Sequence, residues 1–216
     1  MAIKILIADD HRILSEAIGT LLNNEFDMEV IAHAENGRDA VRLANELKPD
    51  IIIMDTDMPE LNGIEATRQI TKQMPETKVI ALSEHLDKRS VCEMLKAGAS
   101  SFVPKKSAFA ELLAAIRTVA SNKTYLSSNV SQIVLEQYLH KSEHGDSAYN
   151  VLTAREREVL QLIAEGKSTK AIAKQLFLSI KTIEWHRSRI MNKLDTKSIA
   201  KLVKYAIREG LTCAYA

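Results

Sequence analysis

Short runs rich in β-branched and aliphatic residues alternate with helix-periodic segments from residue 3 to about residue 121, and this alternation limits the fold more than any other feature. A repeated order of strand and helix predicts a parallel sheet covered by helices on both faces. The β-rich runs span 3–8, 29–34, 51–54, 79–82 and 101–103, and the amphipathic segments lie near 13–23, 38–47, 64–74, 89–97 and 108–121. These five units predict a doubly wound α/β domain at residues 1–121.

Helical patterns alone follow this first domain. One weak helical stretch at 130–139 precedes a polar run at 140–147, which carries too little apolar surface to order itself strongly. We therefore expect a linker with a weak helix at residues 122–147. Helical patterns near 154–165, 169–176, 180–194 and 198–209 then predict a small all-α domain at residues 148–213.

The two halves of the chain differ in charge, although the net charge of all 216 residues is only +1. Residues 1–149 hold 16 Lys and Arg against 22 Asp and Glu, a net charge of −6, whereas residues 150–216 hold 13 against 6, a net charge of +7. A small basic domain is typical of a nucleic-acid binder, but a solvated basic surface without a ligand has the same composition. Charge alone leaves both interpretations open.

The sequence shows neither a targeting segment nor a membrane span. No run of about 18 apolar residues occurs, and residues 1–4 lead towards an acidic pair rather than a signal-type apolar core. Cys92 and Cys213 show neither CxxC nor zinc-ligand spacing, which indicates ordinary reduced thiols. We expect a cytoplasmic protein that uses no cysteine chemistry and binds no membrane.

Polar side chains follow four of the predicted strands at the point where each strand ends. Asp9 and Asp10 come after the first strand, Asp55 after the third, Ser83 after the fourth and Lys105 after the fifth. The carboxyl ends of parallel strands meet in one crevice, so we expect these groups to converge there. Three carboxylates repel one another, and a hard divalent cation such as Mg²⁺ relieves that repulsion. The hydroxyl and the ammonium suit phosphoryl oxygens, with Asp55 as the nucleophile.

Each of these residues also has a purely structural interpretation. An Asp directly before a helix is often the N-cap of that helix, and Asp10 occupies such a position. A lone Ser or Lys at a strand end is more often incidental than functional. The joint occurrence on four strands favours the functional interpretation.

Four stretches of the first domain resemble the receiver domain of bacterial response regulators: ILIADDH at 5–11, MDTDMPELNG at 54–63, ALS at 81–83 and FVPK at 102–105. The resemblance implies a flavodoxin-like sheet of five strands in the order 2-1-3-4-5. It implies that Asp55 accepts a phosphoryl group from a sensor histidine kinase, with Mg²⁺ as cofactor. The Mg²⁺ ligands would be Asp10, Asp55 and the backbone carbonyl of Asp57, with Asp9 helping.

The same resemblance assigns a switch pair, Ser83 and Phe102, next to Lys105. In that family the hydroxyl moves to the phosphoryl oxygen while the aromatic ring packs inward, which alters the surface beside the fourth and fifth strands. Phe102 has no hydroxyl to hold it outside, so on sequence alone it is equally well a core aromatic.

Two positions depart from the receiver pattern. Glu84 stands where the family usually has a small or apolar residue, and Asp57 adds a second negative side chain near the acceptor. Carboxylates at this mouth repel an incoming phosphodonor or water. We expect the phosphorylation and self-hydrolysis rates to differ from those of a neutral variant.

An enzyme is the remote alternative for this domain. The sequence Asp55-Thr56-Asp57 after an apolar strand also resembles the DxDx[TV] motif of haloacid-dehalogenase-type phosphatases, in which the first Asp is phosphorylated and the second is a general acid. Position 59 is Pro59 rather than Thr or Val. That nucleophile also follows the first strand of its fold, which would leave Asp9 and Asp10 without a role.

The second domain has the helix boundaries of a helix-turn-helix unit. Thr153 and Glu156 match a capping box, and Gly166 is a plausible stop for the helix that they begin. A short helix and a tight turn at 177–178 then lead to Ser179, the expected N-cap of the helix at 180–194.

Three stretches of this domain closely resemble the LuxR-type DNA-binding domain: LTAREREVL at 152–160, EGKS at 165–168 and SIKTIEWHR at 179–187. The resemblance implies that residues 180–193 form a recognition helix in the major groove. Base-edge contacts would come from Glu184, Trp185 and Ser188, and phosphate contacts from Lys181, Thr182, Arg189 and Lys193. His186 and Arg187 belong to the same candidate set, Arg187 either beside the core or on a flanking phosphate. We expect Glu184 to favour cytosine.

Apolar residues at helical spacing on the final helix cover the core of the small domain or form a dimer interface, and the resemblance favours the second. These residues are Ile199, Leu202, Val203 and Ala206. The combined prediction is a NarL/FixJ-type response regulator whose phosphorylation favours a DNA-binding, dimeric state, without turnover of a substrate. The alternative is a phosphorylation-independent DNA-binding regulator with a degenerate receiver.

Overall fold

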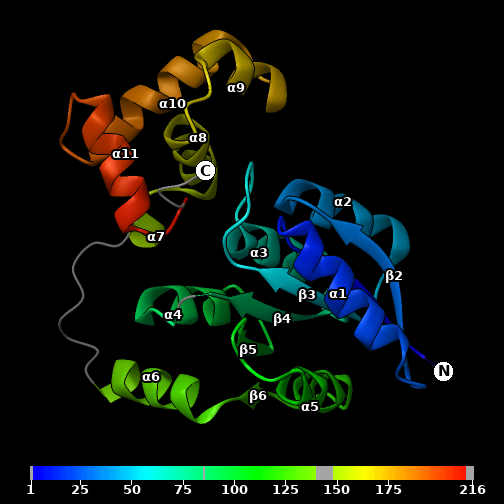
Figure 1. Cartoon of the computed structure of the whole chain (residues 1–216). Coiled ribbons are helices and arrows are strands. Elements are labelled where there is room, and N and C mark those ends of the chain that lie inside the picture. Colours follow the sequence, from blue (N-terminus) through cyan, green and yellow to red (C-terminus); the bar gives the residue numbers. More distant parts are fainter. Residues whose placement is uncertain (1, 85, 140–147, 213–216) are drawn as a thin grey trace. The chain divides into compact units, whose positions relative to one another are not determined.

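The computed structural model describes residues 2–84, 86–139 and 148–212 and divides the chain into two compact units, residues 1–141 and 142–216 (Figure 1). The polar run at 140–147 and Cys213 lie outside the described residues.

A parallel sheet of six strands forms the centre of unit 1. The strands are β1 (Ile3–Ala8), β2 (Met28–Ala34), β3 (Ile51–Asp55), β4 (Lys78–Ser83), β5 (Ser101–Pro104) and β6 (Tyr125–Leu126), in the order β2-β1-β3-β4-β5-β6. The prediction of a parallel α/β sheet is confirmed, but the number of five strands was one too few. β6 has only two residues, which is too short for a β-type pattern, and it pairs with β5 through Tyr125 and Leu126.

Helices cover both faces of this sheet. They are α1 (Arg12–Asn23), α2 (Gly37–Leu47), α3 (Gly63–Gln73), α4 (Lys88–Lys96) and α5 (Phe109–Ala120). Residues of α1 and α5, including Leu22 and Ile116, pack on alternate strand residues such as Ile7 and Ile53. The helices α2, α3 and α4 pack against the strands as well. Burial from both faces explains why β1 and β3 are nearly continuous apolar runs.

The segment after α5 stays attached to unit 1. Helix α6 (Ser128–Leu139) follows β6 and packs against α4. Lys88 of α4 and Glu136 of α6 form an ion pair of 2.6 Å. β6 and α6 therefore belong to unit 1 and lie in the segment 122–147, which the sequence predicts to be a linker with a weak helix.

Helices are the only regular secondary structure among the described residues of unit 2. It contains α7 (Ala148–Val151), α8 (Ala154–Ala164), α9 (Thr169–Gln175), α10 (Ile180–Lys193) and α11 (Ile199–Arg208). Its core includes Leu160, Ile172 and Ile190. The predicted capping box is present, because Thr153 accepts from the backbone N–H of Glu156 while the Glu156 side chain accepts from the backbone N–H of Thr153. Ser179 caps α10 by accepting from the backbone N–H of Thr182.

Candidate functional site

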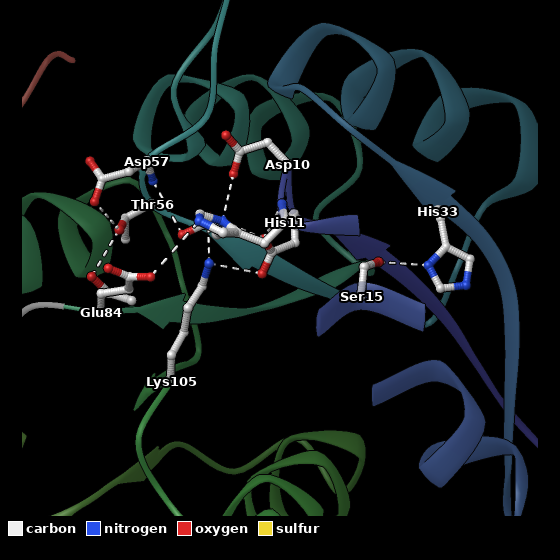
Figure 2. Close-up of polar contacts among 11 residues, drawn as sticks. Asp10, His11, Ser15, His33, Thr56, Asp57, Glu84 and Lys105 are labelled. Atoms are coloured by element: carbon white, nitrogen blue, oxygen red, sulfur yellow. Dashed lines mark hydrogen bonds and ion pairs between the residues drawn. The ribbon is translucent and has the colours of Figure 1, made fainter. Parts of the chain in front are cut away.

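The crevice at the carboxyl ends of the strands contains a buried ion cluster. The Lys105 Nζ atom lies 2.9 Å from Asp9 Oδ2 and 2.8 Å from Asp55 Oδ2. Figure 2 shows the ammonium reaching across the crevice towards the carboxylates. Only 6% of the Lys105 side chain is exposed, against 1% for Asp9 and 2% for Asp55. Residues from three strand ends therefore meet as the sequence predicted.

Burial controls the ionisation of this cluster. It raises the pKa of Asp55 to about 7; Lys105 opposes this shift and Asp9 adds to it. Burial also acts to lower the pKa of Lys105, but the two carboxylates outweigh it and hold that pKa above its ordinary value. When Asp55 is ionised, one ammonium faces two carboxylates, and the crevice then carries a net negative charge that a further cation would neutralise.

The geometry at the mouth of the crevice fits a hard cation. Asp9, Asp10, His11 and Asp55 each offer one ligand atom, and these atoms lie within 4.8 Å of one another. Carboxylate oxygens are the donors that Mg²⁺ prefers. The backbone N–H of Asp57 donates to Asp55 Oδ1 at 3.3 Å, so the loop after β3 contacts the Asp55 carboxylate. The interpretation of Asp10 as an N-cap is wrong, because the N-cap of α1 is His11, without a side-chain hydrogen bond.

Gly63 allows a close contact between the start of α3 and the end of β3. A Cβ atom at Gly63, the first residue of α3, would lie 1.8 Å from the carbonyl oxygen of Asp55. The backbone N–H of Gly63 also donates to the carbonyl of Thr56 at 3.0 Å. Only glycine permits this approach, so the start of α3 can close directly onto the end of β3.

The two predicted switch residues, Ser83 and Phe102, are both buried. Ser83 ends β4, is 1% exposed, and lies 2.9 Å from the Thr56 hydroxyl. Phe102 on β5 is fully buried. Thr56 was not a predicted site residue, and the only signal for it was its place directly after Asp55. Its hydroxyl also lies 3.1 Å from Asp57 Oδ2.

Glu84 stands at the mouth of the crevice, with 56% of its side chain exposed. Its Oε1 atom lies 3.9 Å from Nε2 of His11, whose Nδ1 atom lies 2.9 Å from Asp10 Oδ1. Figure 2 shows the imidazole between the two carboxylates. Sequence reasoning missed His11 as a mouth residue, although it directly follows Asp10.

In unit 2, helix α10 buries Ile183 and Ile190 and turns its polar residues outward. Lys181, Glu184 and Ser188 are exposed, and Trp185 is 52% exposed. Thr182 and Arg187 are half-buried.

Three of the predicted DNA contacts have intramolecular surroundings that the sequence did not reveal. Lys193 Nζ lies 2.6 Å from Glu156 Oε2, and Arg189 Nε lies 3.6 Å from Glu156 Oε1. His186 is half-buried with its ring 4.9 Å from that of Trp185. Burial lowers the pKa of His186, and the positive charge of Arg155 acts in the same direction.

The structure corrects the predicted dimer surface on α11. Leu202 and Ala206 are fully buried in the core of unit 2, because they lie on the helix face that turns inward. Their side chains are therefore not available to a partner. Ile199 is 51% exposed and Val203 is half-buried, so these two remain candidates.

Two families match the two units. The response regulator receiver domain matches residues 5–117, and the bacterial regulatory proteins of the luxR family match residues 150–206. The oxygen regulatory protein NreC of Staphylococcus haemolyticus is 38% identical over 213 residues, which cover 96% of this chain and 98% of that protein. The chain is a response regulator of the NarL/FixJ family.

Further relatives match this response regulator over nearly its whole length. The transcriptional regulatory protein LiaR of Bacillus subtilis is 39% identical over 97% of this chain and 99% of its own. A structure of the RcsB response regulator of Salmonella typhimurium is 25% identical, with a TM-score of 0.65, and the match covers 96% of this chain and 98% of that chain.

Both matched domains make this response regulator a phosphorylation-controlled transcription regulator with a LuxR-type DNA-binding domain. This family is not one of turnover enzymes, so we do not retain the phosphatase alternative. Among the described residues, no helix is both long and apolar enough to cross a membrane.

Proposed function

We propose that Asp55 is the phosphoacceptor and that a sensor histidine kinase supplies the phosphoryl group. The observation that carries this proposal is the contact of Lys105 Nζ with both Asp55 and Asp9 in a buried crevice. A carboxylate oxygen of Asp55 forms a bond to phosphorus while the bond between phosphorus and the donor histidine nitrogen breaks. That nitrogen leaves with the electron pair and takes up a proton. Lys105 and Ser83 would bind phosphoryl oxygens.

Mg²⁺ fits the acidic mouth of this crevice. Asp10, Asp55 and the backbone carbonyl of Asp57 would hold the ion, with Asp9 behind them. The bound ion would neutralise charge on the carboxylates and the phosphoryl oxygens. Water can later hydrolyse the acyl phosphate at Asp55, which returns the protein to its resting state without turnover of a separate substrate.

Phosphorylation of the full chain by acetyl phosphate tests the acceptor. Intact-mass measurement should show one phosphoryl group on the wild type in the presence of Mg²⁺, and much less when EDTA replaces Mg²⁺. Asp55→Asn should remove the adduct, whereas Asp57→Asn, which keeps the backbone carbonyl, should retain it. An adduct of unchanged yield on Asp55→Asn would place the acceptor elsewhere.

Helix α10 is the proposed DNA-reading element of unit 2. Its exposed Lys181 and its half-buried Thr182 suit phosphate contacts, while Glu184, Trp185 and Ser188 suit base edges. The net charge of +7 on residues 150–216 supports this assignment. Lys181→Ala should weaken binding to all duplexes alike, whereas Glu184→Ala should change the preferred sequence in a selection from random DNA.

A two-fold symmetric pair of chains would match a two-fold symmetric DNA site. Ile199 and Val203 of α11 are the proposed contact residues, because Leu202 and Ala206 are used by the core. Sedimentation of phosphorylated wild type and of Ile199→Glu on DNA tests this pairing. Loss of the second protomer in the variant is the expected result.

The position of Glu84 favours a second candidate function, DNA binding that is independent of phosphorylation. Its carboxylate is 56% exposed at the mouth through which a phosphodonor must enter. DNA affinity of wild type and Asp55→Ala, each with and without acetyl phosphate, separates the two candidates. A stimulation seen only in wild type supports the phosphorylation switch, and equal affinities in all four samples support the alternative.

A further inference from the structure

The carboxylate of Glu156 in α8 is almost completely buried, with 2% of its side chain exposed. Its capping-box role occupies one oxygen, because the backbone N–H of Thr153 donates to Oε2 at 2.9 Å and the Thr153 hydroxyl donates to the same atom at 3.1 Å. An N-cap partner needs no cation beside it. The cations around Glu156 therefore require a separate explanation.

Two cations of α10 converge on this carboxylate. Lys193 Nζ donates to Glu156 Oε2 at 2.6 Å and to the carbonyl of Val151 at 3.2 Å. Arg189 Nε lies 3.6 Å from the other oxygen, Oε1. Burial tends to raise the pKa of Glu156, but hydrogen bonds from Lys193 and Thr153 outweigh it and lower that pKa. The carboxylate is thus ionised at neutral pH and attracts both cations.

The same arginine also holds the indole of Trp185. The guanidinium carbon of Arg189 lies 4.8 Å from the centre of the Trp185 ring, a cation–π contact. A chain of contacts therefore runs from the start of α8, through Arg189, to a half-exposed aromatic ring on α10. An indole on a flexible χ1 and χ2 has several rotamers, and a planar cation on one side restricts them.

We propose that Glu156 is a positioning residue for DNA recognition. It holds Lys193 away from the phosphates and holds Arg189 against Trp185, so that the indole presents one orientation to the base edges. This inference rests on the proposed DNA contact by α10. It also changes the predicted contacts, because Lys193 serves the fold of unit 2 rather than the DNA backbone.

The salt dependence of DNA binding by the full chain distinguishes cations that pair with Glu156 from cations that contact DNA phosphates. Each phosphate neutralised contributes about 0.9 to the slope of log affinity against log salt. On a duplex selected by the wild type from random DNA, Lys181→Ala should make the slope shallower by about 1. Lys193→Ala should change it by less than half of that, as should the control Lys123→Ala, which removes an exposed cation from unit 1.

Specificity and fluorescence test the orientation of Trp185, the single tryptophan of the chain. Glu156→Gln keeps an oxygen for the Thr153 N–H but removes the charge. Without DNA, Glu156→Gln and Arg189→Lys should both lower the fluorescence anisotropy of Trp185. Both should reduce the ratio of affinities for the selected and a scrambled duplex by about tenfold or more, because a loosely held indole discriminates poorly, while affinity for the scrambled duplex stays within about twofold.

The outcomes distinguish three situations. Equal loss of affinity for both duplexes, or a Lys193→Ala slope change as large as that of Lys181→Ala, overturns the positioning role. An unchanged slope in Lys181→Ala instead contradicts the proposed DNA contact by α10. If circular dichroism shows that Glu156→Gln does not fold, Arg189→Lys and Lys193→Ala decide, because both keep the buried Glu156 carboxylate and at least one cation beside it.

Discussion

The hydroxyls of Thr56 and Ser83 lie 2.9 Å apart in a buried contact between the end of β3 and the end of β4. Both residues are almost inaccessible, with exposures of 2% and 1%. The proposed switch requires the Ser83 hydroxyl to turn towards a phosphoryl group on Asp55. Thr56 therefore holds Ser83 in the arrangement of the unphosphorylated protein.

Removal of the Thr56 hydroxyl should shift the switch. A net hydrogen bond contributes about 0.5–1.5 kcal/mol, and a bond specific to the resting state opposes activation by that amount. Thr56→Val should raise the DNA affinity of the unphosphorylated full chain by about 2- to 10-fold. Titration of a selected duplex measures this. Ser83→Ala is the control for a switch without its hydroxyl, and an affinity of Thr56→Val equal to that of wild type would contradict the resting-state role.

Lys105 should be necessary for stability when no metal is present. Replacing it by Met leaves Asp9 and Asp55 buried without their cation, and removal of one partner of a buried ion pair costs about 3–5 kcal/mol. Urea unfolding in EDTA should show this loss in unit 1. The double variant Lys105→Met with Asp55→Asn should recover part of it, whereas additive losses would mean that the two side chains do not interact.

The raised pKa of Asp55 predicts a pH dependence in the absence of metal. Its pKa is about 7 in the folded chain against 3.8 for the free group. Below the lower value both states are protonated and no penalty exists. Between the two values the stability of unit 1 should fall with rising pH, at most by about 1.4 kcal/mol per unit, and it should be lowest above pH 7.

Urea unfolding of the full chain in EDTA, repeated between pH 4.5 and 7.5 and followed by circular dichroism, measures this slope. Asp55→Asn should flatten the pH dependence of the transition that belongs to unit 1. An equal slope in wild type and Asp55→Asn would assign the dependence to other groups.

Replacing the Glu84 carboxylate by a neutral group should speed phosphorylation of the protein. A unit charge several ångströms from an incoming dianion in a water-exposed mouth contributes on the order of 1 kcal/mol. Glu84→Gln should therefore raise the rate of phosphorylation by acetyl phosphate by about fivefold at low salt, and less at high salt. Glu76→Gln is the matched control, because Glu76 is an exposed glutamate of the loop before β4. Equal rates for wild type and Glu84→Gln would contradict the prediction.

The ion pair between Lys88 and Glu136 should help to hold α6 against α4. Both side chains are partly exposed, at 59% and 38%, so the pair is worth at most about 1 kcal/mol. Lys88→Glu should make the amide hydrogens of α6 exchange several-fold faster, as followed by mass spectrometry. The double reversal Lys88→Glu with Glu136→Lys should restore slow exchange. Faster exchange in the double variant than in the single one would show that the pair does not hold the helix.

Much of the fold could be predicted because the apolar pattern of each segment matches the strand or helix that the segment forms. The first strand, Ile3–Ala8, was predicted with the bounds that the structure has, and the other predicted strands differ by one or two residues in total. β6 could not be predicted, since two residues show no periodicity and their pairing with β5 depends on distant sequence. Helix boundaries with side-chain caps, such as Thr153 and Ser179, were also identifiable.

The candidate site was predictable only where function follows from position along a strand. Asp9, Asp55 and Lys105 follow strands, so their convergence follows from the topology of a parallel sheet. The contacts of Thr56 with Ser83 and of Glu156 with Lys193 could not be predicted. These partners are 27 and 37 positions apart in the sequence. The burial of Leu202 on α11 also depends on which face meets the core, which a helical pattern leaves open.

The sixth strand has a practical consequence for engineering. A chimera that joins this receiver to another output module at residue 121 would remove β6 from the edge of β5 and α6 from α4. The exposed backbone of β5 would then be free to pair with another chain. A fusion junction placed after Leu139 keeps both elements, so exchange of output modules should begin there.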